Sequence, residues 1–168
     1  MPSASSRAAD PEFGPTDVPT VFFVSKSDDR NRVDYGIRLD AACNPEGKDP
    51  VVAYWREFEN SPVTTHGLNL PEREYAYGVA EQEELPRSQA GAQMRVRIKA
   101  LSRDIVLTTF KDARGQCRAV ATTTVARVPD AVLESVYLSL RKPRDVAYLD
   151  IHGLDPRTGQ RMIERIVN

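Results

Sequence analysis

The chain has two histidines, the side chains best suited to proton transfer or metal binding near neutral pH. His66 and His152 both occur in a His-Gly-Leu sequence. A closed zinc site needs three or four ligands, and neither an HxH nor an HxxxH spacing is present. We therefore expect solvated or turn histidines, with no metal and no cofactor.

Paired carboxylates suggest a different chemistry. Glu72 and Glu74, like Glu81 and Glu83, are two residues apart. On a strand they would share one face about 7 Å apart, a separation that an inverting glycoside hydrolase could use. A hydrolase built from Glu72, Glu74 and His66 is therefore one hypothesis, although solvated acid pairs are common.

Cys43 and Cys117 are the only cysteines, and neither belongs to a CxxC pair. A thiolate nucleophile would need an activating histidine supplied by the fold. A disulfide would require an oxidising compartment. We favour two free, partly buried thiols.

A cationic stripe of Arg95, Arg97 and Lys99 alternates with apolar residues. It would grip an anionic ligand, or it would pair with acids of residues 81–84 on the adjacent antiparallel strand. We favour the pairing with acids.

Four aromatic residues form the strongest candidate for binding a ligand or partner: Tyr54, Trp55, Tyr75 and Tyr77. Period-two spacing would put Tyr75 and Tyr77 on one strand face. Aromatic side chains beside polar groups line ligand cavities and anchor interfaces, but they fill cores more often.

The polar segment 60–74 follows Tyr54 and Trp55, and a long loop of this kind is a common functional element. Within it, residues 70–74 fit one helical turn, with Pro71 at its start.

Short apolar runs bounded by turn residues must position all of these side chains. The clearest is the alternation of Met94, Val96 and Ile98 with polar residues, a pattern typical of a half-buried strand. Residues 111–115 and 155–159 indicate hairpins. About nine or ten such strands have short connections, which join only antiparallel neighbours. We predict an all-β fold: an antiparallel meander that forms a barrel, or a two-sheet sandwich as the close second.

Length and charge limit the remaining possibilities. The chain has 168 residues and a net charge of −1, so the basic excess of a nucleic-acid binder is missing. No apolar run reaches the ~20 residues of a membrane-spanning helix.

Residues 1–17 are interpreted as a flexible tail, a leader remnant or a cloning remnant, and residues 18–168 as one β domain. The compartment would be cytoplasmic if Met1 is the natural start, or periplasmic or secreted if a leader was removed.

Three segments together resemble a bacterial family of uncharacterised proteins, a domain of unknown function typified by Bacteroides-type members. They are residues 22–27 with Asn31, Val33 and Tyr35; residues 50–55; and Leu70 and Glu72 with residues 76–79. The resemblance covers roughly residues 18–167. It implies a shared fold and members that often look exported, but no activity.

We therefore predict a non-enzymatic β domain that binds a small molecule or a protein. Its site would use the four aromatic residues with the cationic stripe. The hydrolase and a structural assembly subunit are the alternatives, and the oligomeric state is left open.

Overall fold

A computed structural model describes residues 18–142 and 145–168 of the chain. Residues 1–17, interpreted above as a tail, lie outside the described part. The described residues form eleven strands and one π-helical turn, η2. In chain order the elements are β1 (Thr20–Lys26), β2 (Arg32–Ile37), β3 (Val51–Glu57), β4 (Thr64–Gly67), η2 (Glu72–Ala76), β5 (Val79–Ser88), β6 (Gly91–Ile98), β7 (Leu101–Lys111), β8 (Cys117–Val125), β9 (Val128–Lys142), β10 (Asp145–Leu154) and β11 (Arg161–Val167).

The all-β prediction is confirmed, but the sheet is mixed and open. Its strands follow the order β4-β3-β2-β1-β9-β8-β7-β6-β5, with β10 and β11 attached beyond β9. β1 pairs with β9 in parallel, whereas a purely antiparallel sheet was predicted. Short connections do join antiparallel neighbours here. β1 and β9, however, are linked through seven other strands, which supply the long crossover that parallel pairing needs.

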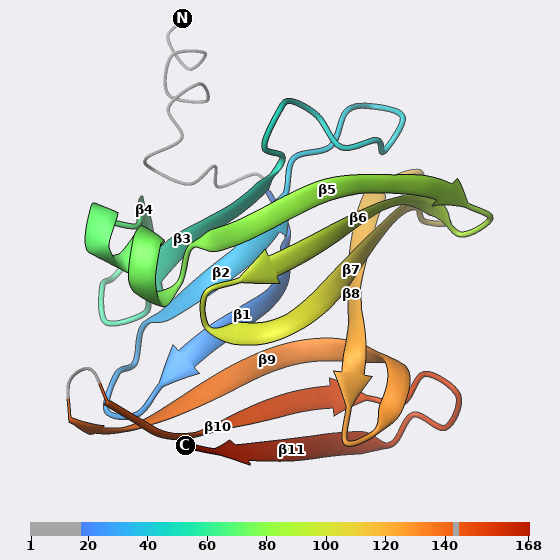
Figure 1. Ribbon diagram of the computed structural model, residues 1–168. Coiled ribbons are helices and arrows are strands. Elements are labelled where there is room, and N and C mark those ends of the chain that lie inside the picture. Colours follow the sequence, from blue (N-terminus) through green and yellow to red (C-terminus); the bar gives the residue numbers. More distant parts are fainter. Residues whose placement is uncertain (1–17, 143–144) are drawn as a thin grey trace, which may run out of the picture.

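The sheet forks at β9. The first part of β9 pairs with β8, as in the register of Thr122 with Val132, and a later part pairs with β1, as in Val24 with Val136. One arm therefore runs through β1, β2, β3 and β4, and the other through β8, β7, β6 and β5. In Figure 1, β9, β10 and β11 form the lower part of the molecule and β5 and β6 the upper part. Among the described residues the two arms do not join by backbone pairing, so the barrel predicted as first choice is not closed.

The core fills the space between the arms. Phe22, Val33 and Tyr35 come from one arm, and Val96 and Leu107 from the other. Phe22 and Tyr35 stack with ring centroids 4.7 Å apart. The alternation predicted around Met94 appears in β6, where every second residue is buried.

The predicted hairpins are confirmed, and their turns have local causes. The Asp112 carboxylate accepts hydrogen bonds from the backbone N–H groups of Arg114 and Gln116. Gly115 then adopts a φ of 77°, a left-handed conformation that favours glycine.

The segment 60–74 differs from the predicted long loop. It contains β4, which pairs with the end of β3, and it leads into η2. The sequence of β4 is polar, so it lacks the apolar alternation that marks a strand. The predicted helical turn is confirmed: Pro71 has φ −60° and ψ −39° at its start.

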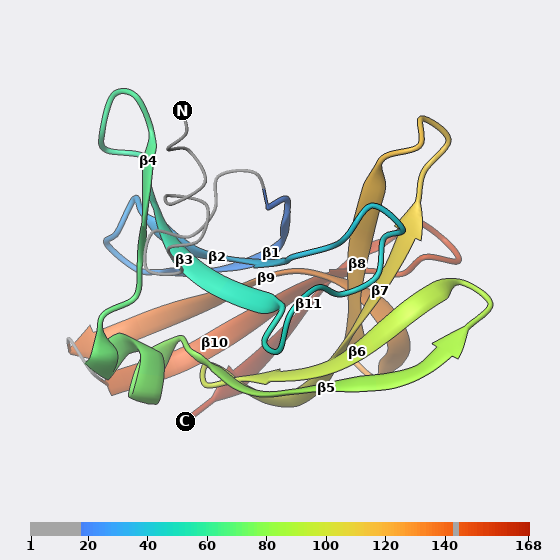
Figure 2. The same cartoon turned by 90° about the horizontal axis from the view of Figure 1, so that it is seen from above.

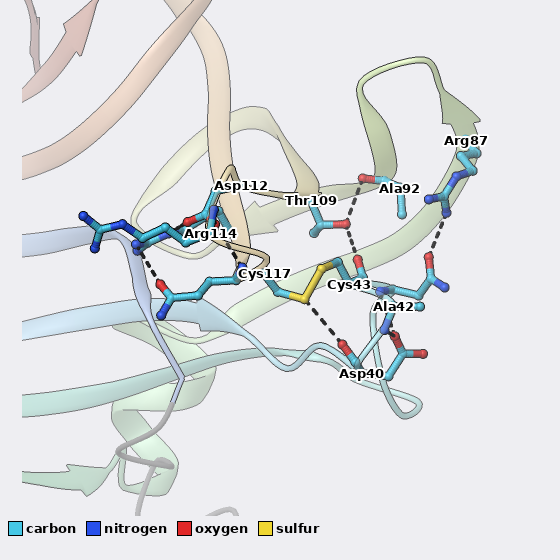
Figure 3. The surroundings of a disulfide bond; sticks show 12 residues. Asp40, Ala42, Cys43, Arg87, Ala92, Thr109, Asp112, Arg114 and Cys117 are labelled. Carbon is cyan, nitrogen blue, oxygen red and sulfur yellow. Dashed lines mark hydrogen bonds and ion pairs between the residues drawn. A yellow bond between two sulfur atoms is a disulfide. The ribbon is translucent and has the colours of Figure 1, made fainter.

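Cys43 and Cys117 form a disulfide, so the expectation of two free thiols is wrong. The bond joins the loop after β2 to the start of β8, with Cα atoms 5.2 Å apart (Figure 3). The Thr109 hydroxyl donates a 2.7 Å hydrogen bond to the Cys43 carbonyl and holds the same loop against β7. The sequence reasoning failed here because the two cysteines meet only when a loop and a distant hairpin fold together.

Within the described residues, no helix has both the length and the apolar character that crossing a membrane requires.

Candidate functional site

A cleft separates the two arms where the sheet stays open. β4 pairs with residues Tyr54 to Glu57 of β3, so in the described part of the chain the beginning of β3 has no strand neighbour on that side. The start of β5 lies opposite this part (Figure 2). The cleft has a volume of about 560 Å³, within the range of sites for small molecules. Its lining residues are Arg38, Asp49, Val51, Val52, Ala53, Gly67, Leu68, Arg73, Gly78 and Val79.

The Gln82 side chain bridges the two arms beside this cleft. Its Oε1 accepts a 2.9 Å hydrogen bond from the Val51 N–H, and its Nε2 donates a 3.3 Å bond to the Val51 carbonyl. The side-chain amide thus occupies the place that a neighbouring strand's backbone would take. Because the glutamine side chain stands between the two backbones, β3 and β5 are farther apart than directly hydrogen-bonded strands.

Two arginines of the cleft keep most of their hydrogen-bonding capacity. Arg38 donates one 3.5 Å bond to the Asp49 carbonyl, and Arg73 donates one 3.1 Å bond to the Leu68 carbonyl. Across residues 18–142 and 145–168, neither guanidinium forms an ion pair with a carboxylate. A guanidinium carries five N–H donors, so each arginine has several left over.

The main chain around Arg73 is fixed by its neighbours. The Asn69 N–H donates to the Glu72 carboxylate and the Glu72 N–H donates to the Asn69 side chain, each at 2.9 Å. A Cβ placed on Gly78 would lie only 1.8 Å from the Arg73 carbonyl oxygen. Glycine at this position therefore lets η2 pack tightly against the start of β5.

The predicted aromatic site is only partly brought together. Trp55 and Tyr77 pack edge to face, with centroids 5.4 Å apart, in the same core as the cleft residues Val51 and Leu68. Burial raises the pKa of the Tyr77 hydroxyl, and the nearby Lys26 opposes that rise. Both rings are buried. Trp55 and Tyr77 therefore support the cleft rather than line it.

Tyr54 and Tyr75 lie elsewhere. Tyr54 is fully buried on the other face of β3, where its hydroxyl donates to the Val18 carbonyl at 3.3 Å. Tyr75 lies on η2 with 80 % of its surface exposed. The expectation that Tyr75 and Tyr77 share a strand face is wrong, because the chain is helical at Tyr75.

The predicted pairing of the cationic stripe with acids of residues 81–84 holds for Arg95 alone, and Arg97 pairs instead with Asp104 of β7. Arg95 lies 3.1 Å from Glu83, and Arg97 lies 2.8 Å from Asp104. The hydrogen bond from Arg97 lowers the pKa of Asp104, and Arg95 adds to that effect. Lys99 is exposed beyond the end of β6. These contacts neutralise most of the stripe.

The residues of the hydrolase hypothesis have separate partners. His66 Nε2 lies 2.8 Å from a Glu57 oxygen, and its Nδ1 lies 3.0 Å from the Gly67 carbonyl. The Glu72 carboxylate accepts the hydrogen bond of the Asn69 N–H, and Glu74 is exposed. In the part of the chain that the structure describes, no three His, Cys, Asp or Glu side chains form a group that could hold a metal ion.

Sequence reasoning missed Arg38, Arg73 and Gln82. Arg73 stands in the segment already singled out as a functional loop, and Arg38 alternates outward on an apolar strand pattern. These residues share a site because β3 and β5 lie opposite each other, and these two strands are not consecutive in the sequence.

Comparisons with known proteins support one part of the resemblance seen in the sequence, the membership in a domain of unknown function. No curated protein and no solved structure matches the chain significantly. A family model described as a domain of unknown function (DUF4833) matches residues 22–165. This match spans both arms, the cleft and most of β11, so the chain belongs to the DUF4833 family.

Proposed function

We propose that this protein is a non-enzymatic binding domain that takes a small molecule into the cleft between β3 and β5. The observation that carries the proposal is the cleft itself, about 560 Å³ in volume, with apolar side chains and unpaired arginines in its lining. Binding sites commonly combine a mainly apolar wall with a few polar groups that orient the ligand.

The structure of the cleft walls supports a preformed site. The Cys43–Cys117 disulfide anchors the loop that carries Arg38 and Asp49 at its two ends. Gly78 and the reciprocal Asn69–Glu72 bonds anchor the opposite wall. A site that is already ordered loses less conformational entropy when a ligand binds.

A hydrolase is the less favoured alternative, because His66 pairs with Glu57 rather than with Glu72 or Glu74. An assembly subunit would use an open strand edge. β11 has such an edge, with Ile163 and Val167 exposed. Concentration-dependent sedimentation of the purified protein would favour assembly over the small-molecule site.

We also propose that the protein works in an oxidising compartment, since disulfides persist mainly there. This agrees with the exported bacterial members, of the Bacteroides type, that the sequence resemblance implies.

The small-molecule proposal is tested by titrating the ¹⁵N-labelled protein with four matched phenyl probes: benzyl alcohol, benzylamine, phenylacetate and phenyl phosphate. We expect at least one probe, at millimolar concentration, to shift the amide signals of Gly67, Leu68 and Gly78. Ala53→Leu, which narrows the cleft, should weaken that binding. Ala119→Leu on β8, also a half-buried alanine but outside the cleft, should not. Shifts that are absent, or that appear only on β9 to β11, would reject the cleft as the site.

A further inference from the structure

We infer that the cleft selects an organic anion, with Arg38 and Arg73 as its counter-charges and the apolar wall as the contact for the rest of the ligand. The inference rests on the proposed function and adds the chemical class of the ligand.

The first support is the contrast between these two arginines and three arginines of the strands that are paired with acids. Arg95, Arg103 and Arg165 each lie within 3.1 Å of a carboxylate. Arg38 and Arg73 instead contact only a backbone carbonyl each among the described residues. A guanidinium that faces a cleft and forms no ion pair with a carboxylate is suited to receive an anionic oxygen group from a ligand, because its N–H donors form charge-assisted hydrogen bonds.

The second support is the charge balance of the lining. Its ionisable side chains are two arginines and one aspartate, Asp49. The charges of the lining therefore sum to +1, since the two guanidinium charges exceed the one carboxylate. This balance contrasts with the net charge of −1 for the whole chain. The cleft is a local positive site on a slightly acidic protein.

The third support is the separate anchoring of the two arginines. Arg38 follows β2 and belongs to the loop that Cys43 ties to β8. Arg73 belongs to η2, which Gly78 allows to pack against β5. Arg38 therefore stands on the arm of β1 to β4, and Arg73 stands on the connection that runs from β4 to β5. An anion in the cleft would hold these two segments together through charge, as Gln82 links β5 to β3 through hydrogen bonds.

The apolar part of the lining limits the ligand further. Val51 and Leu68 are buried, and Ala53 and Val79 are partly buried against the same core. A bare inorganic ion would leave this wall without a contact. We therefore expect an acidic group, carboxylate or phosphate, on an apolar body.

The same four phenyl probes separate this inference from the proposed function. We expect phenylacetate or phenyl phosphate to bind about tenfold more tightly than benzyl alcohol, because two partly exposed ion pairs contribute about threefold each. Comparing the two anions shows which acidic group is preferred. The preference should shrink as salt is added, since salt screens exposed charges.

Arg38→Gln and Arg73→Gln should each reduce the preference for the anion about threefold and leave the affinity for benzyl alcohol unchanged. Arg127→Gln, an exposed arginine outside the cleft lining, is the matched control and should change neither. The inference is overturned if benzyl alcohol binds as tightly as both anions, or if both cleft variants keep the full preference. In either case binding of benzyl alcohol in the cleft would still support the proposed function. If no probe reaches the cleft, the proposed function itself fails.

Discussion

Reduction of the Cys43–Cys117 disulfide should remove a large part of the stability of this protein. The bond closes a loop with a sequence separation of 74 residues. By the chain-entropy relation, closing a loop of this length in the unfolded chain stabilises the folded state by about 4.4 kcal/mol. Domains of this size are typically stable by about 5–15 kcal/mol, so the loss is a substantial fraction of the total.

The one tryptophan of the chain, Trp55, is buried and provides the signal. Guanidinium unfolding followed by its fluorescence, with and without a reductant, should show a lower midpoint for the reduced protein. A variant with both Cys43→Ala and Cys117→Ala should match the reduced protein and should not respond to reductant. Equal midpoints for oxidised and reduced protein, or two titratable thiols in the unreduced denatured protein, would refute the reasoning.

Two further predictions concern charged groups that connect strands. Asp34→Asn should destabilise the fold by about 3 kcal/mol, because the fully buried carboxylate accepts the Nε–H bonds of Arg32 and Arg56 at 2.7 and 2.6 Å. The exposed Asp104→Asn should shift the denaturation midpoint much less in the same assay, because exposed ion pairs contribute little to stability. Glu164 should make stability depend on acid pH, because its hydrogen bonds, chiefly from Arg103, lower its folded pKa below the ordinary 4.5. A lowered folded pKa stabilises the protein above the unfolded value, and this stability is lost as pH falls through the folded one. Unfolding midpoints measured across acid pH should fall less steeply in Glu164→Gln, and an unchanged slope would contradict this role.

Local features of the sequence predicted local features of the fold. The alternation around Val96 predicted β6, and the Asp112 and Gly115 turn predicted the β7–β8 hairpin. The pairing of Arg95 with Glu83 followed from two consecutive strands joined by a short turn. In each case the residues that decide the structure lie within a few positions of each other, or on neighbouring strands of one hairpin.

Features that depend on distant segments were not predictable in this way. The parallel pairing of β1 with β9 has no local signal, because any outward-facing strand edge can pair in either direction. The disulfide depends on the same long-range arrangement. A spacing of two residues predicted a shared strand face for Tyr75 and Tyr77. The same spacing also occurs at the end of a helical turn, and there Tyr75 faces solvent while Tyr77 faces the core.

The cleft exists because β3 of one arm and β5 of the other lie opposite each other without backbone pairing. If β5 paired with the first part of β3 along its backbone, the sheet would close and the strands would lie about 4.8 Å apart. Gln82 replaces this pairing at Val51, because its side chain satisfies both the N–H and the carbonyl of that residue from a greater distance. A buried backbone group left without a partner would be costly, so an open edge at this position needs such a substitute. The same glutamine therefore makes the open sheet stable and keeps apart the walls that carry Arg38 and Arg73.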